Sequence, residues 1–281
     1  MKTRDITQII QAKPASDGAG VRLNRTIGGG GLQGFDPFLM LDEFNSDNAD
    51  DYIAGFPSHP HRGFETVTYM LEGNMLHEDH MGNKGLLQSG DVQWMTAARG
   101  IIHSEMPQQV EGRMRGFQLW INLPAKEKMN DPHYEDIKAA NIPVIETEDY
   151  WVKVVAGNLV LNGQTVVGAV NGISTAPVYL DVRLKPNTSL TLPIADTHKL
   201  LLYVYEGEAR VNEKIVKQQQ MGVSDSGEEL TLNAGDHGLK ALVLAGKPLQ
   251  EPIANWGPFV MNTREEIEQA ISDYRNGVLT Q

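Results

Sequence analysis

The 281-residue sequence contains no cysteine. This absence excludes disulfides, zinc-thiolate sites, iron-sulfur clusters and cysteine nucleophiles, so any metal must be held by His, Asp or Glu. Long apolar runs are also missing, and no stretch approaches the roughly 20 apolar residues that cross a bilayer. Residues 1–18 lack the apolar core and cleavage pattern of a secretory signal. We therefore expect a cytoplasmic protein that does not enter a membrane.

Positive charge is scarce. The chain has 24 Lys and Arg against 36 Asp and Glu, a formal net charge of -12. The basic residues are scattered singly, without the stripe that binding to a phosphate backbone requires. Direct nucleic-acid binding is therefore disfavoured.

Length and pattern together predict an all-β protein of two domains. A chain of this size usually exceeds one hydrophobic core. Short apolar runs alternate with Gly, Asn, Asp and Pro turns, which is typical of barrels and sandwiches. The strands expected from this pattern cover residues 22–26, 65–71, 91–96, 115–123, 152–156, 176–184, 199–205 and 240–244. Residues 126–143 look like a connection, so we divide the chain into domains 1–140 and 141–281.

A single helix is expected at the carboxyl end, as a closing element of the second domain. Thr263 and Glu266 have the spacing of a capping box, and Gly277 supplies a stop. An internal echo supports the two domains, because residues 69–73 (YMLEG) recur as residues 203–207 (YVYEG). A five-residue match of this kind also arises by chance in about one case in three.

Two pairs of metal-binding residue types occur in the first half, His59 with His61 and His103 with Glu105. Side chains at i and i+2 of a strand point to the same face. One His-x-His is a weak signal, since eight histidines produce it by chance in about one sequence in five. Each pair could also be hydrogen-bonded core or a solvated strand face. Together they supply three imidazoles and one carboxylate, a set that suits a transition metal with one or two open positions.

Longer motifs surround these pairs. Residues 55–69 (GFPSHPHRGFETVTY) and 93–107 (QWMTAARGIIHSEMP) resemble the pirin family of double-cupin proteins, and residues 257–263 (GPFVMNT) continue the likeness toward the carboxyl end. The resemblance implies two tandem cupin barrels, double-stranded β-helices of jelly-roll type, with a short C-terminal helix. It also implies that the first barrel binds iron(II) through His59, His61, His103 and Glu105, although other divalent transition metals can occupy such ligands.

Glu65 has a different expected role. Cupins outside the pirin family usually take their carboxylate ligand from this position, whereas pirin-like proteins use the Glu after the last His, here Glu105. Glu65 then becomes a catalytic residue beside the metal, which orients an imidazole or accepts a substrate proton. An ordinary strand carboxylate is the alternative.

The remaining histidines are expected to be structural or solvated. Alignment of the two halves puts Pro193 and Ala195 in the places of His59 and His61, so the second barrel should hold no metal. His77 and His80 lie in a polar stretch with loop-forming neighbours, and we expect them to be solvated.

The resemblance implies a function. Pirin-like proteins are associated with quercetin 2,3-dioxygenase activity, in which a flavonol or similar phenol reacts with O₂; in that reading Glu105 takes the hydroxyl proton. The alternative is a non-enzymatic, redox-sensing regulator whose acidic surface binds a protein partner, such as a transcription factor or a metabolic enzyme. A third alternative is another small enol or phenol as substrate. Because two cupin units already lie in one chain, we expect a monomer.

Overall fold

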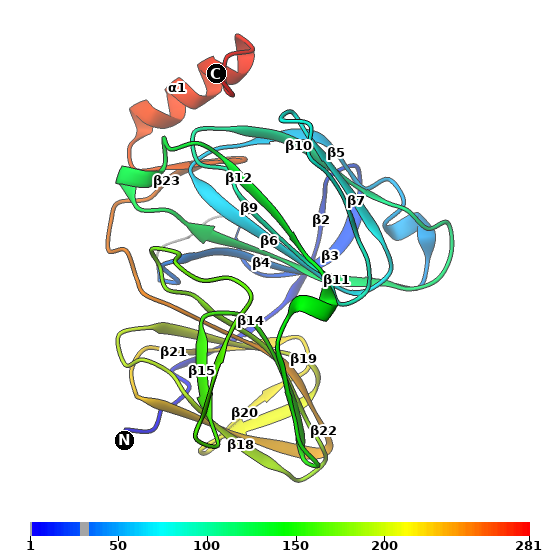
Figure 1. The fold of residues 1–281 in the computed structure, drawn as a ribbon, viewed down its shortest axis with the longest axis vertical. Helices are drawn as coiled ribbons and strands as arrows, with labels where there is room; N and C mark the ends of the chain where they lie inside the picture. The colour runs from blue at the N-terminus through cyan, green and yellow to red at the C-terminus, as the bar shows by residue number, and fades with distance from the viewer. Residues whose placement is uncertain (1, 29–33) are drawn as a thin grey trace. The chain divides into compact units, whose positions relative to one another are not determined.

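The computed structural model describes residues 2–28 and 34–281 and is built almost entirely of β-strands (Figure 1). The chain forms two compact units. One, called the histidine unit below, contains Lys13–Ala139 and Leu249–Gln281. The other, called the apolar unit, contains Met1–Ala12 and Ala140–Pro248. The predicted all-β fold with a C-terminal helix is confirmed.

The two units depart from the predicted ranges 1–140 and 141–281 at both ends of the chain. The amino-terminal strand β1 (Gln8–Gln11) pairs with β21 (Gln220–Ser224) and so belongs to the apolar unit. The carboxyl-terminal segment belongs to the histidine unit, where Val260 N donates to Arg62 O over 3.0 Å. The assignment of each terminal segment depends on backbone pairing between residues far apart in the sequence, which local sequence patterns do not encode.

The histidine unit contains two antiparallel sheets. The first is built from β2 (Lys13–Asp17), β3 (Val21–Ile27), β4 (Phe38–Ser46), β6 (Phe64–Glu72), β9 (Val92–Thr96), β11 (Met114–Asn122) and β12 (His133–Ile137), in the order β12-β9-β6-β11-β4-β3-β2. The second is built from β5 (Phe56–His61), β7 (Met75–Asp79), β8 (Lys84–Leu87) and β10 (Ile101–Pro107), in the order β5-β10-β7-β8. Short 3₁₀ turns lie at Ala49–Asp51, Ala125–Glu127 and Ala139–Asn141.

Burial explains why these strands form a closed sandwich. One apolar cluster contains Val21 and Met70 from the first sheet and Met75 and Leu87 from the second, so the two sheets share a core. Along β6 every residue from Phe64 to Met70 is buried, on both faces of the strand. Such continuous burial leaves polar side chains of β6 inside the protein, where they need partners.

The apolar unit has a filled interior. Its sheet contains β1, β13 (Val144–Glu146), β14 (Tyr150–Ala156), β17 (Val178–Leu184), β18 (Ser189–Pro193), β19 (Lys199–Val211), β20 (Lys214–Lys217), β21 and β22 (Glu229–Gly246), with a hairpin of β15 (Asn158–Leu161) and β16 (Gln164–Val167) beside it. Its core cluster is made of aliphatic side chains. Pro193 and Ala195, which align with the first two histidines of the motif, are exposed. His198 is a structural residue whose Nε2 lies 2.9 Å from Ala176 O.

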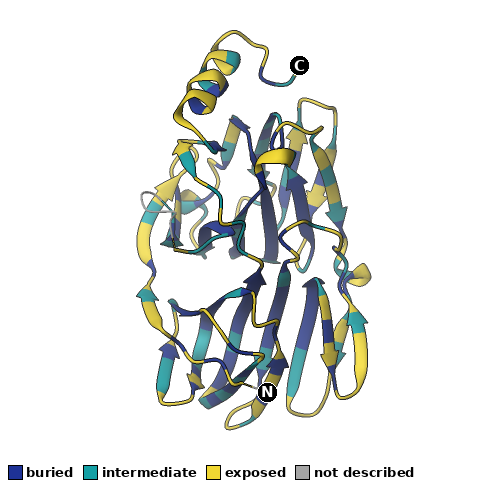
Figure 2. Cartoon of the chain, turned by 90° about the vertical axis from the view of Figure 1, so that its left-hand side faces the viewer, coloured by how far each residue is buried: buried dark blue, intermediate teal, exposed yellow. Residues whose placement is uncertain are grey.

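The predicted helix forms as α1 (Arg264–Arg275), with both halves of the Thr263 and Glu266 capping box in place. It follows the hairpin of β23 (Ala254–Trp256) and β24 (Phe259–Met261) and buries Ile267 and Ala270 while its outer face stays exposed (Figure 2). Ile102 of β10 packs against the same cluster, so α1 closes the histidine unit. No helix within residues 2–28 and 34–281 has the length and apolarity to span a membrane.

Candidate metal and substrate site

Two adjacent strands of the histidine unit bring three histidines together. β5 and β10 run antiparallel, with His103 opposite His59 and Ile101 opposite His61. Their potential ligand atoms all lie within 4.8 Å of one another. Nε2 of His59 lies 3.0 Å from Nε2 of His61, and the rings of His59 and His103 have centroids 4.4 Å apart. The expected convergence of these three side chains is therefore present.

The donor set fits a metal ion. Burial, followed by the influence of neighbouring imidazoles, holds the pKa of both His61 and His103 well below the usual value. Histidines in such surroundings are neutral and keep a lone pair for coordination. Nε2 of His103 is buried without a hydrogen-bond partner among the described residues, although buried ring nitrogens nearly always have one. An ion between the three rings would satisfy this nitrogen.

Glu105 shares the site but is not part of the histidine cluster. The pairing of β10 with β5 shifts register between His103 and Glu105. A register shift of this kind re-aims a side chain. The Glu105 carboxylate accepts hydrogen bonds from Thr68 Oγ1 at 2.8 Å and Gln118 Nε2 at 2.9 Å. The fourth predicted ligand thus stands beside the three histidines, held by two donors.

Glu65 lies on the other side of the sheet. Thr68, which contacts Glu105, and Glu65 are three positions apart on β6, and alternation along a strand puts such residues on opposite faces. Oε1 of Glu65 accepts a hydrogen bond of 2.8 Å from Thr96 Oγ1, and burial raises the pKa of Glu65 to about 7. Glu65 does not line the cavity described below, so the geometry gives its predicted catalytic role no support.

A cavity of about 740 Å³ opens onto His59 and His61. Its size is within the roughly 300 to 1,000 Å³ of small-molecule sites. His59, His61 and Glu105 line it together with Gln118 and Thr68. Its apolar lining includes Leu23, Leu39, Met40, Phe44, Phe56 and Trp120. The interior therefore combines an apolar wall with a few convergent polar groups, as sites for small organic molecules do.

An ion pair forms part of the cavity wall. Arg25 donates to both carboxylate oxygens of Asp42, over 2.8 and 2.6 Å, and to Asp17 over 2.7 Å. The hydrogen bond to Asp42 is the main cause that raises the pKa of Arg25. Since Arg25 is neutralised by two carboxylates, it adds a fixed polar edge to the cavity rather than a free positive charge.

Two aromatic side chains that the sequence did not single out hold His61 in place. The ring of Trp120 on β11 meets His61 edge-on, with centroids 5.3 Å apart, and Phe64 does the same at 5.1 Å. Phe64 and Trp120 also contact each other at 4.4 Å. One signal in the sequence could have indicated that Trp120 contacts the site. Trp120 is two positions from Gln118 on β11, and such residues share a face of the strand.

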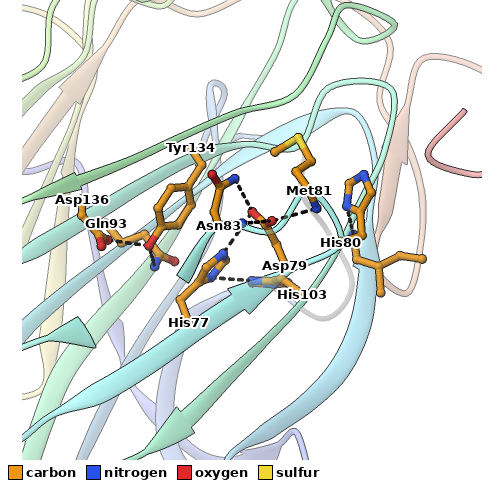
Figure 3. A network of polar contacts seen from close by, with 10 residues as sticks. His77, Asp79, His80, Met81, Asn83, Gln93, His103, Tyr134 and Asp136 are labelled. Atoms are coloured by element: carbon orange, nitrogen blue, oxygen red, sulfur yellow. Dashed lines mark hydrogen bonds and ion pairs between the residues drawn. The ribbon is translucent and has the colours of Figure 1, made fainter. Parts of the chain in front are cut away.

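His77 contradicts its predicted solvated state. It lies on β7, fully buried, with Nδ1 3.3 Å from Nδ1 of His103 and Nε2 3.3 Å from Asp79 Oδ2 (Figure 3). Its ring stacks on Tyr134 of β12, with centroids 4.4 Å apart. Burial comes from a strand more than 50 residues away, and for that reason the polar neighbours of His77 misled the prediction. His80 is exposed, as expected.

One β-barrel gathers three neutral imidazoles beside a ligand-sized cavity, and a second barrel lies in the same chain. Together they define a double cupin with one metal-type site among the residues that the structure describes. The family model named Pirin matches residues 20–121, and the model of the pirin C-terminal cupin domain matches residues 179–280. The chain belongs to the pirin family.

Individual relatives extend over the whole chain. A Pseudomonas aeruginosa protein named provisionally as a quercetin 2,3-dioxygenase is 56% identical and covers 98% of each chain. A pirin-like protein of Caulobacter vibrioides is 46% identical over 99% of each chain. The crystal structure of quercetin 2,3-dioxygenase from Acinetobacter baumannii superposes with a TM-score of 0.90 at 33% identity, covering 99% of this chain and 98% of that one. These similarities, together with the histidine cluster, support a divalent metal and a small-molecule substrate.

Proposed function

We propose that the histidine unit binds iron(II) through His59, His61, His103 and Glu105 and catalyses the reaction of a flavonol such as quercetin with O₂. In this reaction both atoms of O₂ enter the substrate, the heterocycle opens, and one ring carbon leaves as carbon monoxide. The observation that carries the proposal is the convergence of three imidazoles, two of which line a cavity that also holds Glu105. The names of the relatives from P. aeruginosa and A. baumannii point to the same substrate.

The residues divide the work between binding and proton transfer. Glu105 takes the proton from the 3-hydroxyl of the flavonol, and Thr68 and Gln118 hold its carboxylate in position. The apolar walls near Phe56 and Trp120 accept the flat rings and keep water away from the reacting carbon atoms. Iron(II), when bound, supplies the Lewis acidity and the redox chemistry that a reaction with O₂ requires.

Anaerobic reconstitution tests the proposal. The metal-free protein is titrated with iron(II) and then given quercetin and O₂, while O₂ uptake and carbon monoxide release are measured. We expect one iron per chain and equal amounts of O₂ consumed and carbon monoxide released. The variant His59→Ala should lose both iron and turnover. His237→Ala, which removes an exposed histidine of the apolar unit, should retain them.

The other outcomes separate the alternatives. Iron bound at one per chain without turnover of quercetin or other phenols rejects the dioxygenase and leaves the predicted regulator, with a protein partner. Equal occupancy by nickel, manganese, cobalt or copper under competition rejects iron as the specific metal. A wild-type protein that binds no metal at all rejects both functions. Location in the cytoplasm and a monomeric state stay predictions, and light scattering after size exclusion checks the second.

A further inference from the structure

A chain of polar contacts extends from His103 through His77 to Asp79 (Figure 3). Nδ1 of His103 faces Nδ1 of His77 at 3.3 Å, and Nε2 of His77 faces Asp79 Oδ2 at 3.3 Å. His103 and His77 are both buried, and the side chain of Asp79 is 0% exposed. No step of the proposed reaction uses His77 or Asp79.

Asp79 is fixed as an acceptor by the turn that follows it. Its Oδ1 accepts hydrogen bonds from Met81 N at 2.9 Å and Asn83 N at 3.0 Å. Its Oδ2 accepts a further hydrogen bond of 2.8 Å from Asn83 Nδ2 and also faces His77. A carboxylate surrounded by donors on both oxygens accepts a proton-bearing nitrogen from His77 rather than donating to it.

This arrangement determines where each ring carries its proton. Because Asp79 accepts, the proton of neutral His77 lies on Nε2. Nδ1 of His77 is then a bare acceptor, so the contact with His103 requires the proton of His103 to lie on its Nδ1. The lone pair of His103 is left on Nε2, the buried nitrogen that has no partner among the described residues and belongs to the histidine cluster.

We propose that Asp79 and His77 are positioning residues that fix His103 as its Nδ1–H tautomer and so present Nε2 of His103 to the metal. The inference rests on the metal site of the proposed function and does not depend on any substrate. Ligand histidines in metalloproteins are commonly oriented by an acceptor on their second nitrogen, and loss of such an acceptor typically lowers metal affinity 10- to 100-fold. Here the acceptor is a second histidine, oriented in turn by a carboxylate.

The contacts from His103 through His77 to Asp79 are called the histidine relay below. Packing fixes the plane of the His77 ring within it. His77 stacks on Tyr134 with an angle of 26° between the rings, and Tyr134 OH donates to Asp136 Oδ1 over 2.6 Å. Gln93 Nε2 lies 3.3 Å from the same hydroxyl. These contacts hold the ring of His77 against rotation, so the direction of its two nitrogens is set before any metal binds.

The first test reverses the direction of the hydrogen bonds between Asp79, His77 and His103. In Asp79→Asn, the side-chain oxygen still accepts from the two backbone N–H groups of the turn, and the amide N–H₂ faces His77 in place of Oδ2. The hydrogen bond from Asn83 Nδ2 to that atom is lost. His77 then accepts on Nε2, donates from Nδ1 to His103, and leaves the proton of His103 on Nε2. We expect this variant to bind iron(II) or zinc(II) 10- to 100-fold more weakly in competition with a chromophoric chelator.

Long-range ¹H–¹⁵N correlation spectra of the metal-free protein read the tautomers directly, with the His103 signals assigned by their loss in His103→Ala. We expect Nδ1–H for His103 in the wild type and Nε2–H in Asp79→Asn. The variant His77→Phe keeps the stacking on Tyr134 but removes the acceptor, and should lose metal affinity to a similar extent. If the substitution at Asp79 disrupts the turn, the metal affinity of His77→Phe tests the proposal in its place. His80→Ala removes an exposed imidazole of the same turn and should bind metal like the wild type.

The histidine relay is refuted if His103 of the metal-free wild type carries its proton on Nε2. It is equally refuted if Asp79→Asn and His77→Phe fold and bind metal as tightly as the wild type. Because the tautomer is measured without metal, substrate or O₂, absence of turnover on quercetin would reject the dioxygenase and leave this result standing.

Discussion

Nε2 of Gln118 donates a 2.9 Å hydrogen bond to Oε2 of Glu105, joining β11 of one sheet to β10 of the other. Both residues line the cavity, and the Glu105 side chain is almost fully buried. A buried carboxylate needs such donors to stay in one orientation. The contact therefore decides where the oxygens of Glu105 point when a substrate enters.

Replacement of Gln118 by Leu removes this donor at similar volume. The other donor, Thr68, remains, so we expect the variant to retain its iron. It should lose about ten- to hundredfold in kcat/KM for quercetin, the effect of one hydrogen bond to a charged group. Gln108→Leu, at an exposed position beyond Glu105, is the matched control and should keep wild-type kinetics. Unchanged kinetics in Gln118→Leu would show that the contact does not position Glu105 for the reaction.

Glu65 makes the stability of the histidine unit depend on pH. Burial raises its pKa from 4.5 to about 7, so the folded protein binds a proton that the unfolded chain has released in this range. Stability from this group is therefore full below pH 4.5 and is lost as the pH rises through 7. The loss amounts to roughly 3 kcal/mol at most, from a shift of this size.

Glu65→Gln should remove that dependence, because an amide has no proton to lose. Urea unfolding at pH 5 and pH 8 measures the free energy of unfolding of both proteins. From pH 5 to pH 8, the wild type should lose more stability than Glu65→Gln. Glu135→Gln, on an exposed position of β12, should show no such gain. Parallel pH curves for Glu65→Gln and the wild type would mean that the Glu65 carboxyl titrates near its ordinary pKa.

The sequence predicted those features that depend on neighbouring residues. His59 and His61 share a face because a strand alternates, and the capping box at Thr263 needs only four residues. The expected segments at 65–71 and 115–123 correspond to β6 and β11 with small shifts of their ends. Local periodicity was sufficient for each of these.

Features that depend on distant contacts were missed. The register shift on β10 between His103 and Glu105 could not be read from their i and i+2 spacing. His77 is buried by Tyr134, and the carboxyl-terminal segment joins the first barrel through Arg62. In each case the deciding partner lies far along the chain, where a pattern of neighbours carries no information about it.

Lys128 connects three separate segments of the histidine unit through hydrogen bonds. Its buried Nζ donates to Gly63 O and Asn122 Oδ1, both at 2.6 Å, and to Val260 O at 3.0 Å. Lys128→Met should lower the free energy of unfolding by about 3 kcal/mol or more, since three buried acceptors lose their donor. The exposed Lys126→Met controls for removal of a lysine and should change stability by less than about 0.5 kcal/mol. Denaturant unfolding measures both, and equal stability of the two variants would contradict a tie through Lys128.

Arg62, the residue after the His-x-His pair, connects the metal strand to α1. Its Nη1 donates to Asp273 Oδ2 over 2.7 Å, its Nη2 donates to Leu279 O over 2.9 Å, and its Nε donates to Arg99 O. The Arg62 side chain is only 4% exposed. Removal of the negative charge at Asp273 therefore leaves the buried guanidinium without its ion-pair partner.

We expect Asp273→Asn to destabilise the histidine unit by about 1.5 to 3 kcal/mol, the range for hydrogen bonds to charged groups. Glu268→Gln is the matched control on the same helix, because its pair with Arg264 is exposed and such pairs contribute about 0 to 1 kcal/mol. Tryptophan fluorescence reports mainly on the histidine unit, since Trp94, Trp120 and Trp256 lie in it and the fourth tryptophan, Trp151, lies in the apolar unit. If α1 belonged to the second domain, as the sequence suggested, Asp273→Asn would leave this fluorescence transition unchanged. A shift of the transition to lower denaturant, absent in Glu268→Gln, is the result that the Arg62 contact requires.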